Sequence, residues 1–298
     1  MLSRWLANYF KTKYRISRFA RSFRIPDSYT VLDIGSGDSP FPAADVICEK
    51  FPWDDRERTA RFKHDRPLVV GDIEHLPFKD KAFDFIFCSH VLEHTLHPDQ
   101  AIAELQRVGK GGYIEVPTSF HEKTVLSYPG HLWFVSREGN NTLVFRQKTS
   151  GIVDAEVNEI VKQKLYEKDP SFEVFYYSRL YDLFLIGLYW KNSISCRVER
   201  SQSASTNFDK ATIDMSHGEI KEARPSNSVG VMKSWIRKYH SRHKKIQLSD
   251  LVVCPNCSGA LARRGMEPIL RCGSCQVNFP IQDEVPVLLK EAASPALR

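Results

Sequence analysis

The sequence lacks a hydrophobic run long enough to cross a lipid bilayer. Its most apolar window, "LFLIGLYW" at Leu183–Trp190, is far shorter than the roughly 20 apolar residues of a membrane helix. The N-terminus is basic, but neither the apolar core nor the small-residue cleavage site of a signal peptide follows it. We therefore expect a cytoplasmic protein with no transmembrane segment.

Cysteine is scarce and unevenly placed. The chain has 7 cysteines, an odd number, and Cys48, Cys88 and Cys196 stand alone. The other four form two Cys-x2-Cys pairs in "CPNCSGALARRGMEPILRCGSC". This pattern favours metal ligation in a reducing compartment over a disulfide framework.

The two cysteine pairs predict a structural metal site. A spacing of 14 residues between the pairs is close to the usual spacing for tetrahedral Zn²⁺, and a closed site of four thiolates is structural rather than catalytic. Gly273 and Ser274 are expected to form the tight turn within the second pair. The expected zinc ligands are Cys254, Cys257, Cys272 and Cys275.

Acidic residues are absent from two basic segments. Residues 1–24 and 224–245 each contain seven Lys and Arg and no Asp or Glu. Because these cations exceed the net charge of +6, the rest of the chain is net acidic. Such arms can bind RNA or an anionic surface, although a solvated helix face is the commoner reason for a basic run.

Short apolar runs alternate with a helical pattern between the basic segments, in a chain of 298 residues that is 42% hydrophobic. The run "HPDQAIAELQRVG" has the spacing of a helix with one apolar face. The alternation predicts an α/β fold with a mostly parallel sheet wrapped by helices. Further along, "WFVSREGNNTLVF" predicts a hairpin, and "LFLIGLYW" with "ISCRVE" predicts a final strand pair. The extended runs of the sheet are "TVLDIG", "ADVICE", "PLVVGD", "AFDFIFCS" and "GGYIEVP".

Acidic residues and glycines gather where the predicted strands end. Ligands of open parallel sheets bind beyond the carboxyl ends of the strands. Asp33 lies at the first of these ends, and Gly35 and Gly37 follow where a backbone could come close to a ligand. Glu49, at the second end, could accept both hydroxyls of a ribose, and Asp72, at the third, could accept from the amine of an adenine. The sequence therefore predicts an adenosine site.

The dinucleotide fingerprint Gly-x-Gly-x-x-Gly is missing, because Pro40 occupies its third glycine position. No basic residue nearby could meet a pyrophosphate, which Asp33 and Asp38 would repel. An acidic loop suits a cationic sulfonium with an α-ammonium group instead.

The stretches "VLDIGSG", "GDIEHLPFKDKAFDFIFCSHVLEH" and "RVGKGGYIEVP" resemble the class I S-adenosylmethionine-dependent methyltransferases, over about residues 30–118. The resemblance implies a methyl-transferring enzyme with a Rossmann-like sheet, helices on both faces, and S-adenosyl-L-methionine as cofactor. Glu49 follows Asp33 by only 16 residues, so the first crossover helix is shortened and Asp54 or Asp55 is an alternative for the ribose. The resemblance implies cofactor binding by Asp33, Gly35, Ser36, Gly37, Glu49, Asp72, Ile73, Ser89 and His90.

The methyl acceptor is not identified by the sequence. The Asn/Asp-Pro-Pro-aromatic signature of amide and exocyclic-amine methylation is absent, since "CSHV" stands after the fourth strand. An oxygen or nitrogen acceptor on a sugar, a small metabolite or RNA is open, with a sugar or small metabolite slightly favoured. The alternative is a methyltransferase-fold protein that has lost turnover and binds RNA or an acidic surface.

A general base is needed only if the acceptor must lose a proton. The candidates are Glu115, His121 and His90. Glu93 and His94 are expected to lie in a solvated first helical turn. The loop beyond the fifth strand adds Glu122 and His131.

The segment "FPIQDEVPVLL" follows the second cysteine pair. Over about residues 251–290 the chain resembles the small zinc-binding subunit that activates eukaryotic tRNA, rRNA and release-factor methyltransferases. Members of that family usually have glycine where this chain has Glu284. The resemblance implies a module that stabilises a catalytic partner, fused here to that partner. The expected domains are a basic N-terminal helix (1–26), a methyltransferase domain (27–200), a flexible linker with a basic helix (201–247) and a zinc-ribbon-like domain (248–292).

Overall fold

The structure is a computed structural model, and it divides into two compact units. Unit 1 comprises residues 1–24, 89–99 and 113–214, and unit 2 comprises residues 25–88, 100–112 and 215–298. Both expected basic arms and nearly all of the expected linker lie outside the described residues. The described residues are 25–37, 40–54, 62, 64–124, 130–149, 160, 161, 163, 172, 180–201, 246–263 and 265–295.

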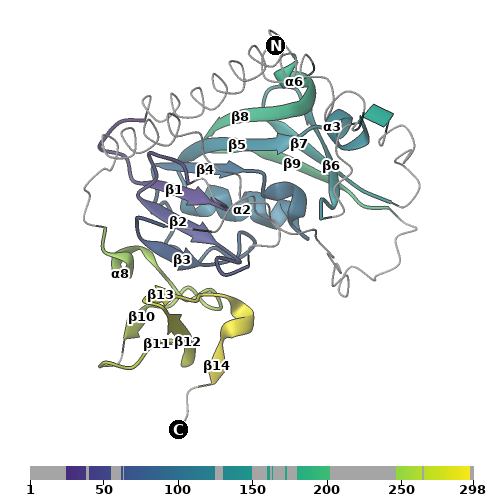
Figure 1. Ribbon diagram of the computed structural model, residues 1–298. Helices are drawn as coiled ribbons and strands as arrows, with labels where there is room; N and C mark the ends of the chain where they lie inside the picture. Colours follow the sequence, from purple (N-terminus) through teal and green to yellow (C-terminus); the bar gives the residue numbers. More distant parts are fainter. Residues whose placement is uncertain are drawn as a thin grey trace. The chain divides into compact units, whose positions relative to one another are not determined.

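Unit 2 holds one end of a parallel sheet (Figure 1). β1 (Val31–Ile34) pairs in parallel with β2 (Val46–Glu49) and with β4 (Phe85–Ser89), and β2 pairs in parallel with β3 (Leu68–Val70). Every residue of β1, β2 and β3 is buried, which explains why these strands are continuous apolar runs rather than alternating ones. The full strand order is β3-β2-β1-β4-β5-β8, with β5 at Gly111–Pro117 and β8 at Leu185–Lys191. The predicted α/β fold is confirmed.

The predicted helix is α2 (Pro98–Val108). Its apolar stripe is fully buried, at Ala101, Ile102, Leu105 and Val108. Gly109 follows at once, and a Cβ atom there would lie 2.5 Å from Ile86 Cδ1. Between β1 and β2, residues 35–37 and 40–45 contain turns but no helix, as the short crossover predicts.

Unit 1 contains a three-stranded sheet. β6 (Trp133–Glu138) and β7 (Thr142–Gln147) form the predicted antiparallel hairpin. β9 (Ser195–Glu199) pairs in parallel with β7, whereas β8 belongs to the other sheet, so the predicted pairing of the last two strands is wrong. Both runs are extended as predicted, but β9 follows the register of β7, with Val198 beside Phe145. The short helices described in unit 1 are η1 (Leu92–His94), α3 (Ser119–Thr124) and α6 (Tyr181–Phe184).

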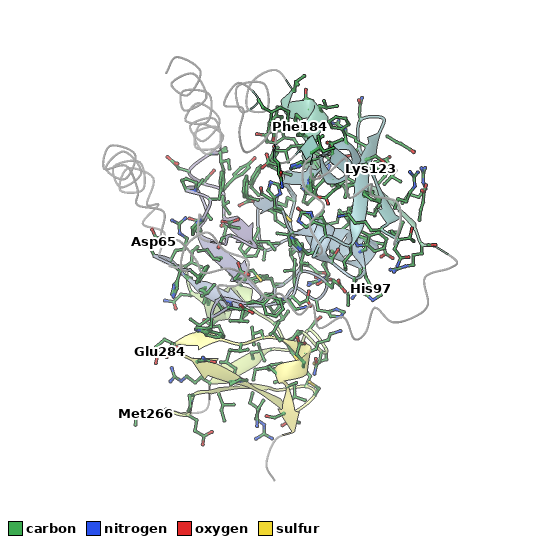
Figure 2. All side chains as sticks on the ribbon, turned by 45° about the vertical axis from the view of Figure 1, so that its right-hand side comes forward. Asp65, His97, Lys123, Phe184, Met266 and Glu284 are labelled. Atoms are coloured by element: carbon green, nitrogen blue, oxygen red, sulfur yellow. The ribbon has the colours of Figure 1, made fainter. Side chains whose placement is uncertain are left out.

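The cysteine module, residues 246–295, is part of unit 2. Glu284, labelled in Figure 2, lies in the two-residue turn between β12 and β13. Asp283 and Glu284 have φ angles of 49° and 62°, so this turn needs left-handed backbone at both positions. The elements are α8 (Leu248–Leu251), β10 (Leu261–Arg263), β11 (Ile269–Cys272), β12 (Val277–Gln282), β13 (Val285–Pro286), η4 (Lys290–Ala292) and β14 (Ser294–Pro295).

The cysteine module packs against β3 of its own unit. Leu288 N donates to Val70 O at 2.8 Å, and Val253 N donates to Pro77 O at 2.9 Å. The buried side chains of Val285 and Val287 join a cluster with those of β2 and β3. Backbone pairing and apolar burial therefore attach the module to the end of the sheet. In the described part of the chain, no helix has the length and apolarity needed to cross a membrane.

Candidate functional site

The loop after β1 brings backbone, rather than side chains, to the end of the sheet. Gly35 and Gly37 have φ angles of 63° and 54°, in the left-handed region that favours glycine. Apart from its chain neighbours, no described residue has an atom within 4 Å of the position that a Cβ would take on Gly37. Ser36 Oγ is buried and has no hydrogen-bond partner among the described residues. The loop therefore presents open space and an unsatisfied hydroxyl.

Glu49, at the end of β2, ties this loop to the sheet. Its carboxylate is mostly buried and accepts from Gly37 N at 3.2 Å and from Lys50 N at 3.1 Å. Asp33 is also buried, and its Oδ2 accepts from Phe41 N at 2.6 Å. Both acidic side chains that the sequence predicts for these strand ends therefore shape the loop.

Asp72 lies beyond β3, with Ile73 buried beside it. Asp72 Oδ2 pairs with Lys50 Nζ at 2.6 Å, and its Oδ1 accepts from Glu74 N at 2.9 Å. Sequence reasoning missed Lys50, although it directly follows Glu49. Of the two alternatives to Glu49, Asp54 is described and Asp55 lies outside the described residues.

In unit 1, Ser89, His90 and Glu115 come together. Glu115 is completely buried, and its carboxylate accepts from Ser89 Oγ at 3.0 Å and from Tyr113 Oη at 2.8 Å. Tyr181 Oη donates to it as well. Three hydroxyl groups therefore occupy this buried carboxylate. Sequence reasoning missed both tyrosines, which contribute only through the fold.

His90 follows β4 with a φ angle of 57°, which is uncommon for a residue other than glycine. Its N–H donates to Glu115 O at 2.8 Å. The ring is 42% exposed, and its Nε2 lies 3.9 Å from Glu115 Oε1. Of the three base candidates, His90 is therefore the accessible one.

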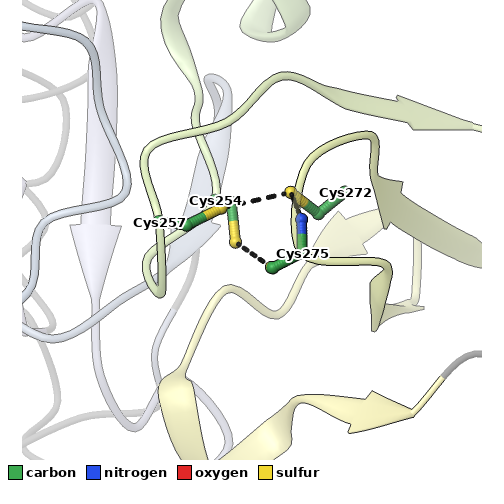
Figure 3. Close-up of side chains that lie close together, drawn as sticks. All are labelled: Cys254, Cys257, Cys272 and Cys275. Carbon is green, nitrogen blue, oxygen red and sulfur yellow. Dashed lines mark hydrogen bonds between the residues drawn. The ribbon is translucent and has the colours of Figure 1, made fainter.

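The four cysteines of the module converge (Figure 3). Cys254 Sγ and Cys275 Sγ are 3.6 Å apart, and Cys257 Sγ and Cys272 Sγ are 3.5 Å apart. Disulfide sulfurs are about 2.05 Å apart, whereas four ligands at about 2.3 Å from a tetrahedral Zn²⁺ lie nearly 4 Å from one another. The donor set and its spacing therefore fit one zinc ion.

The turn expected within the second cysteine pair is present at residues 273–275. The left-handed residues are Ser258 and Gln276, with φ angles of 58° and 60°, each directly after the second cysteine of its pair. Gly273 has no positive φ. Burial raises the pKa of the Cys272 thiol, but the N–H groups of Cys275 and Ser274 outweigh burial and lower it to about 7.

Residues 47–115 match a family model described as a methyltransferase domain. The chain carries a class I S-adenosylmethionine-dependent methyltransferase domain. The demethylmenaquinone methyltransferase of Renibacterium salmoninarum is 34% identical over 100 residues, which is 32% of this chain and 42% of that enzyme. The chain thus spans less than half the length of this relative.

A second similarity involves a small protein. The UPF0434 protein of Dechloromonas aromatica is 43% identical over 47 residues, which is 16% of this chain and 81% of that protein. By this similarity the chain belongs to the UPF0434 family. A solved complex of the Haloferax volcanii Trm112 methyltransferase activator with a methyltransferase contains a similar chain, with 20% identity and a TM-score of 0.27. That match covers 39% of this chain and 57% of the other.

The structure contradicts the expectation that Glu93, within the methyltransferase domain, is exposed to solvent. It was expected in a solvated turn with His94, but Glu93 is completely buried and His94 is half-buried. The cause is long-range, because Leu132 N donates to Glu93 O at 2.8 Å and holds η1 against the start of β6. Burial raises the pKa of Glu93, but nearby His90, His94 and His131 outweigh burial and lower it.

His121 is a core residue rather than a surface base. Only 6% of it is exposed, and its ring packs edge-on against Phe184, labelled in Figure 2, at 5.8 Å between centroids. Burial lowers the pKa of His121 to about 4. The ring is therefore neutral near pH 7, and its surroundings are those of a packed side chain.

Proposed function

We propose that the chain transfers a methyl group from S-adenosyl-L-methionine to an oxygen or nitrogen acceptor. One observation carries the proposal. The left-handed glycine loop after β1 leaves space in front of Gly37 among the described residues, and it precedes residues 47–115, which match the methyltransferase domain. A ligand that comes close to backbone there, and that offers a partner to Ser36 Oγ, fits both features.

The cofactor would be held from several strand ends. Asp33 and the loop at residues 35–37 supply an acidic, backbone-lined surface for the methionine end. Glu49 is proposed for the ribose, since its carboxylate lies directly against Gly37 N. Asp72, with Ile73, is proposed for the adenine. When bound, the cofactor supplies an electrophilic methyl group on a sulfonium.

The chain's own contribution would be orientation and exclusion of water. Holding an acceptor in line with the methyl group can lower the barrier by about 7–11 kcal/mol. Ser89 and His90 are proposed to line the floor after β4. For an acceptor that must lose a proton, His90 is the proposed base because it is accessible, whereas Glu115 and His121 are buried.

The acceptor is proposed to be a sugar or another small metabolite. None of the contacts among the described residues identifies it, so the experiment has to search for it. The purified chain is incubated with methyl-labelled S-adenosylmethionine and fractionated cell extract, and labelled products are separated by class. Labelled metabolites would support the proposal, and labelled RNA would identify RNA as the acceptor instead. Cofactor binding without label transfer to any fraction would indicate a binding protein instead.

A structural zinc ion is the second proposed cofactor. Cys254, Cys257, Cys272 and Cys275 would hold it as four thiolates and keep the cysteine module folded. The proposed domain limits are those given by the sequence, with the zinc-ribbon-like domain at residues 248–292. Metal analysis of chain purified without chelator should find zinc, and the ion should be lost when these cysteines are replaced.

The basic arms, residues 1–24 and 224–245, are proposed to contact the acceptor or an anionic surface rather than the cofactor. Lys and Arg would repel a cationic sulfonium, so neutralising them should leave cofactor affinity unchanged. If the acceptor is RNA, each lost phosphate contact should lower the slope of binding against log salt by about one. A folded variant that lost cofactor binding would contradict this assignment. The variant replaces Lys238, Arg242, Lys244 and Lys245 with glutamine.

A further inference from the structure

Three metal-ligating side chains converge in unit 1, outside the sets assigned above. Glu93, His94 and His131 each offer one ligand atom, and these atoms lie within 4.8 Å of one another. Glu93 and His94 are neighbours in η1, and His131 lies just before β6. The hydrogen bond from Leu132 N to Glu93 O, at 2.8 Å, holds these two segments together. The main chain therefore fixes the cluster.

The carboxylate of Glu93 is buried without a hydrogen bond from the described residues. None of its surface is exposed, and within the described residues neither oxygen accepts a hydrogen bond. His90 Nδ1 approaches Oε1 to 3.3 Å, but that ring is 42% exposed and offsets the charge only when protonated. Burying a carboxylate is costly unless it is paired or coordinates a metal. A cation bound to the carboxylate would offset the cost of burying its charge.

Both histidines are oriented by a hydrogen bond at Nδ1. His94 Nδ1 lies 3.1 Å from Gly130 O, and His131 Nδ1 lies 2.5 Å from Glu122 Oε1. An Nδ1–H that donates to a carbonyl or carboxylate fixes the tautomer in which Nε2 is the ligating atom. The two rings meet edge-on, with centroids 4.5 Å apart. This arrangement is typical of histidines that bind a metal.

The local charge favours a cation. Glu122 is completely buried and pairs with Lys148 as well as with His131. Lys148 pairs with Glu122, whereas no Lys or Arg among the described residues pairs with Glu93. Two imidazoles and one carboxylate suit a transition-metal ion, because Mg²⁺ and Ca²⁺ prefer oxygen ligands throughout.

We propose that Glu93, His94 and His131 bind a divalent first-row transition-metal ion, with Glu122 and Gly130 O orienting the histidines. Three protein ligands leave coordination positions open for a water molecule or a substrate oxygen. An oxygen bound there loses its proton more readily. The site does not depend on the proposed methyl transfer, and it is distinct from the four cysteines.

Cobalt(II) is the probe, because its spectrum separates the two sites. The full chain, with its cysteines loaded with zinc, is titrated with Co²⁺ and followed by visible absorption. We expect one additional Co²⁺ per chain, with d–d bands and no sulfur-to-cobalt charge-transfer band. Glu93→Gln and His131→Gln should each weaken this binding by more than about 100-fold, and Glu122→Gln by about 10–100-fold. His97→Gln, which replaces an exposed histidine of the same segment, should bind as the wild type does.

Thermal unfolding guards against variants that fail to fold. Co²⁺ should raise the melting temperature of the wild type and of His97→Gln but not that of Glu93→Gln, whose metal-free form should melt no lower than the metal-free wild type. Cobalt that binds only with a thiolate band would overturn the proposal. Equal affinity of the wild type and folded Glu93→Gln would do the same, and equal affinity of Glu122→Gln would overturn the role of Glu122.

Discussion

Gly37 allows the cofactor loop to be tested with the backbone effect separated from the ligand effect. Its φ is +54°, and in the described part of the chain no atom beyond its neighbours lies within 4 Å of the position that a Cβ would occupy. Gly37→Val therefore strains the backbone but clashes with nothing in the described part of the chain. A left-handed residue other than glycine destabilises the fold by about 1–2 kcal/mol, and a β-branched side chain adds to this. The new side chain would fill the space proposed for the ligand.

Gly265 supplies the matched control. Its φ is +61°, and its Cβ position is equally empty of atoms from the described residues, but it lies in the loop between β10 and β11. Gly265→Val should therefore cause a comparable loss of stability. Only Gly37→Val should lose affinity for S-adenosylmethionine, by more than about 100-fold, which corresponds to about 2.8 kcal/mol.

Isothermal titration calorimetry measures the affinity of both variants for the cofactor and for its demethylated product, and circular dichroism verifies that both are folded. The wild type should bind both ligands in the micromolar range. If folded Gly37→Val bound within about twofold of the wild type, the loop would not contact the ligand. Equal losses in both variants would show that backbone strain, rather than steric exclusion, removes binding.

Three further outcomes are expected. The pKa of His121 is lowered to about 4 in the folded chain, so as the pH falls the unfolded chain binds a proton first. The contribution of His121 to stability should therefore be complete above about pH 6.5 and fall by about 3 kcal/mol towards pH 4. Denaturation of His121→Gln should lack this pH dependence. Glu284→Gly should stabilise the cysteine module by about 1 kcal/mol, because glycine relieves the left-handed position; a lower midpoint of unfolding would contradict this. Cys272→Ser should reduce the zinc content by one ion per chain in elemental analysis, and an unchanged zinc content would disprove the four-thiolate site.

Several strands, one helix and one hairpin were predictable because each depends on a local sequence pattern. The apolar runs of β1, β2 and β3 are buried on both faces, so short runs of consecutive apolar residues mark them in the sequence. The apolar stripe of α2 repeats with the period of a helix, and the hairpin of β6 and β7 has its turn at Glu138–Asn141. Each of these signals lies within one short window.

Features that depend on distant partners were not predictable in this way. β8 and β9 were correctly extended, but strand pairing is decided between segments far apart, and β9 pairs with β7 instead. The segment of Glu93 has the polarity of a surface turn, and only its contact with Leu132 buries it. The hydroxyls of Tyr113 and Tyr181 reach Glu115 from different elements, and no spacing rule connects them.

The packing of the cysteine module on β3 covers an edge of the parallel sheet and so affects the solubility of the chain. β3 ends the strand order of its sheet, and an uncovered edge strand is a template for pairing with other chains. Leu288 covers Val70 O, and Val285 and Val287 cover the apolar side chains beside it. Unfolding of the module would expose that edge. If the proposed zinc ion keeps the module folded, a chain deprived of zinc should therefore self-associate through the exposed edge of β3, and aggregation would precede any loss of order around the glycine loop.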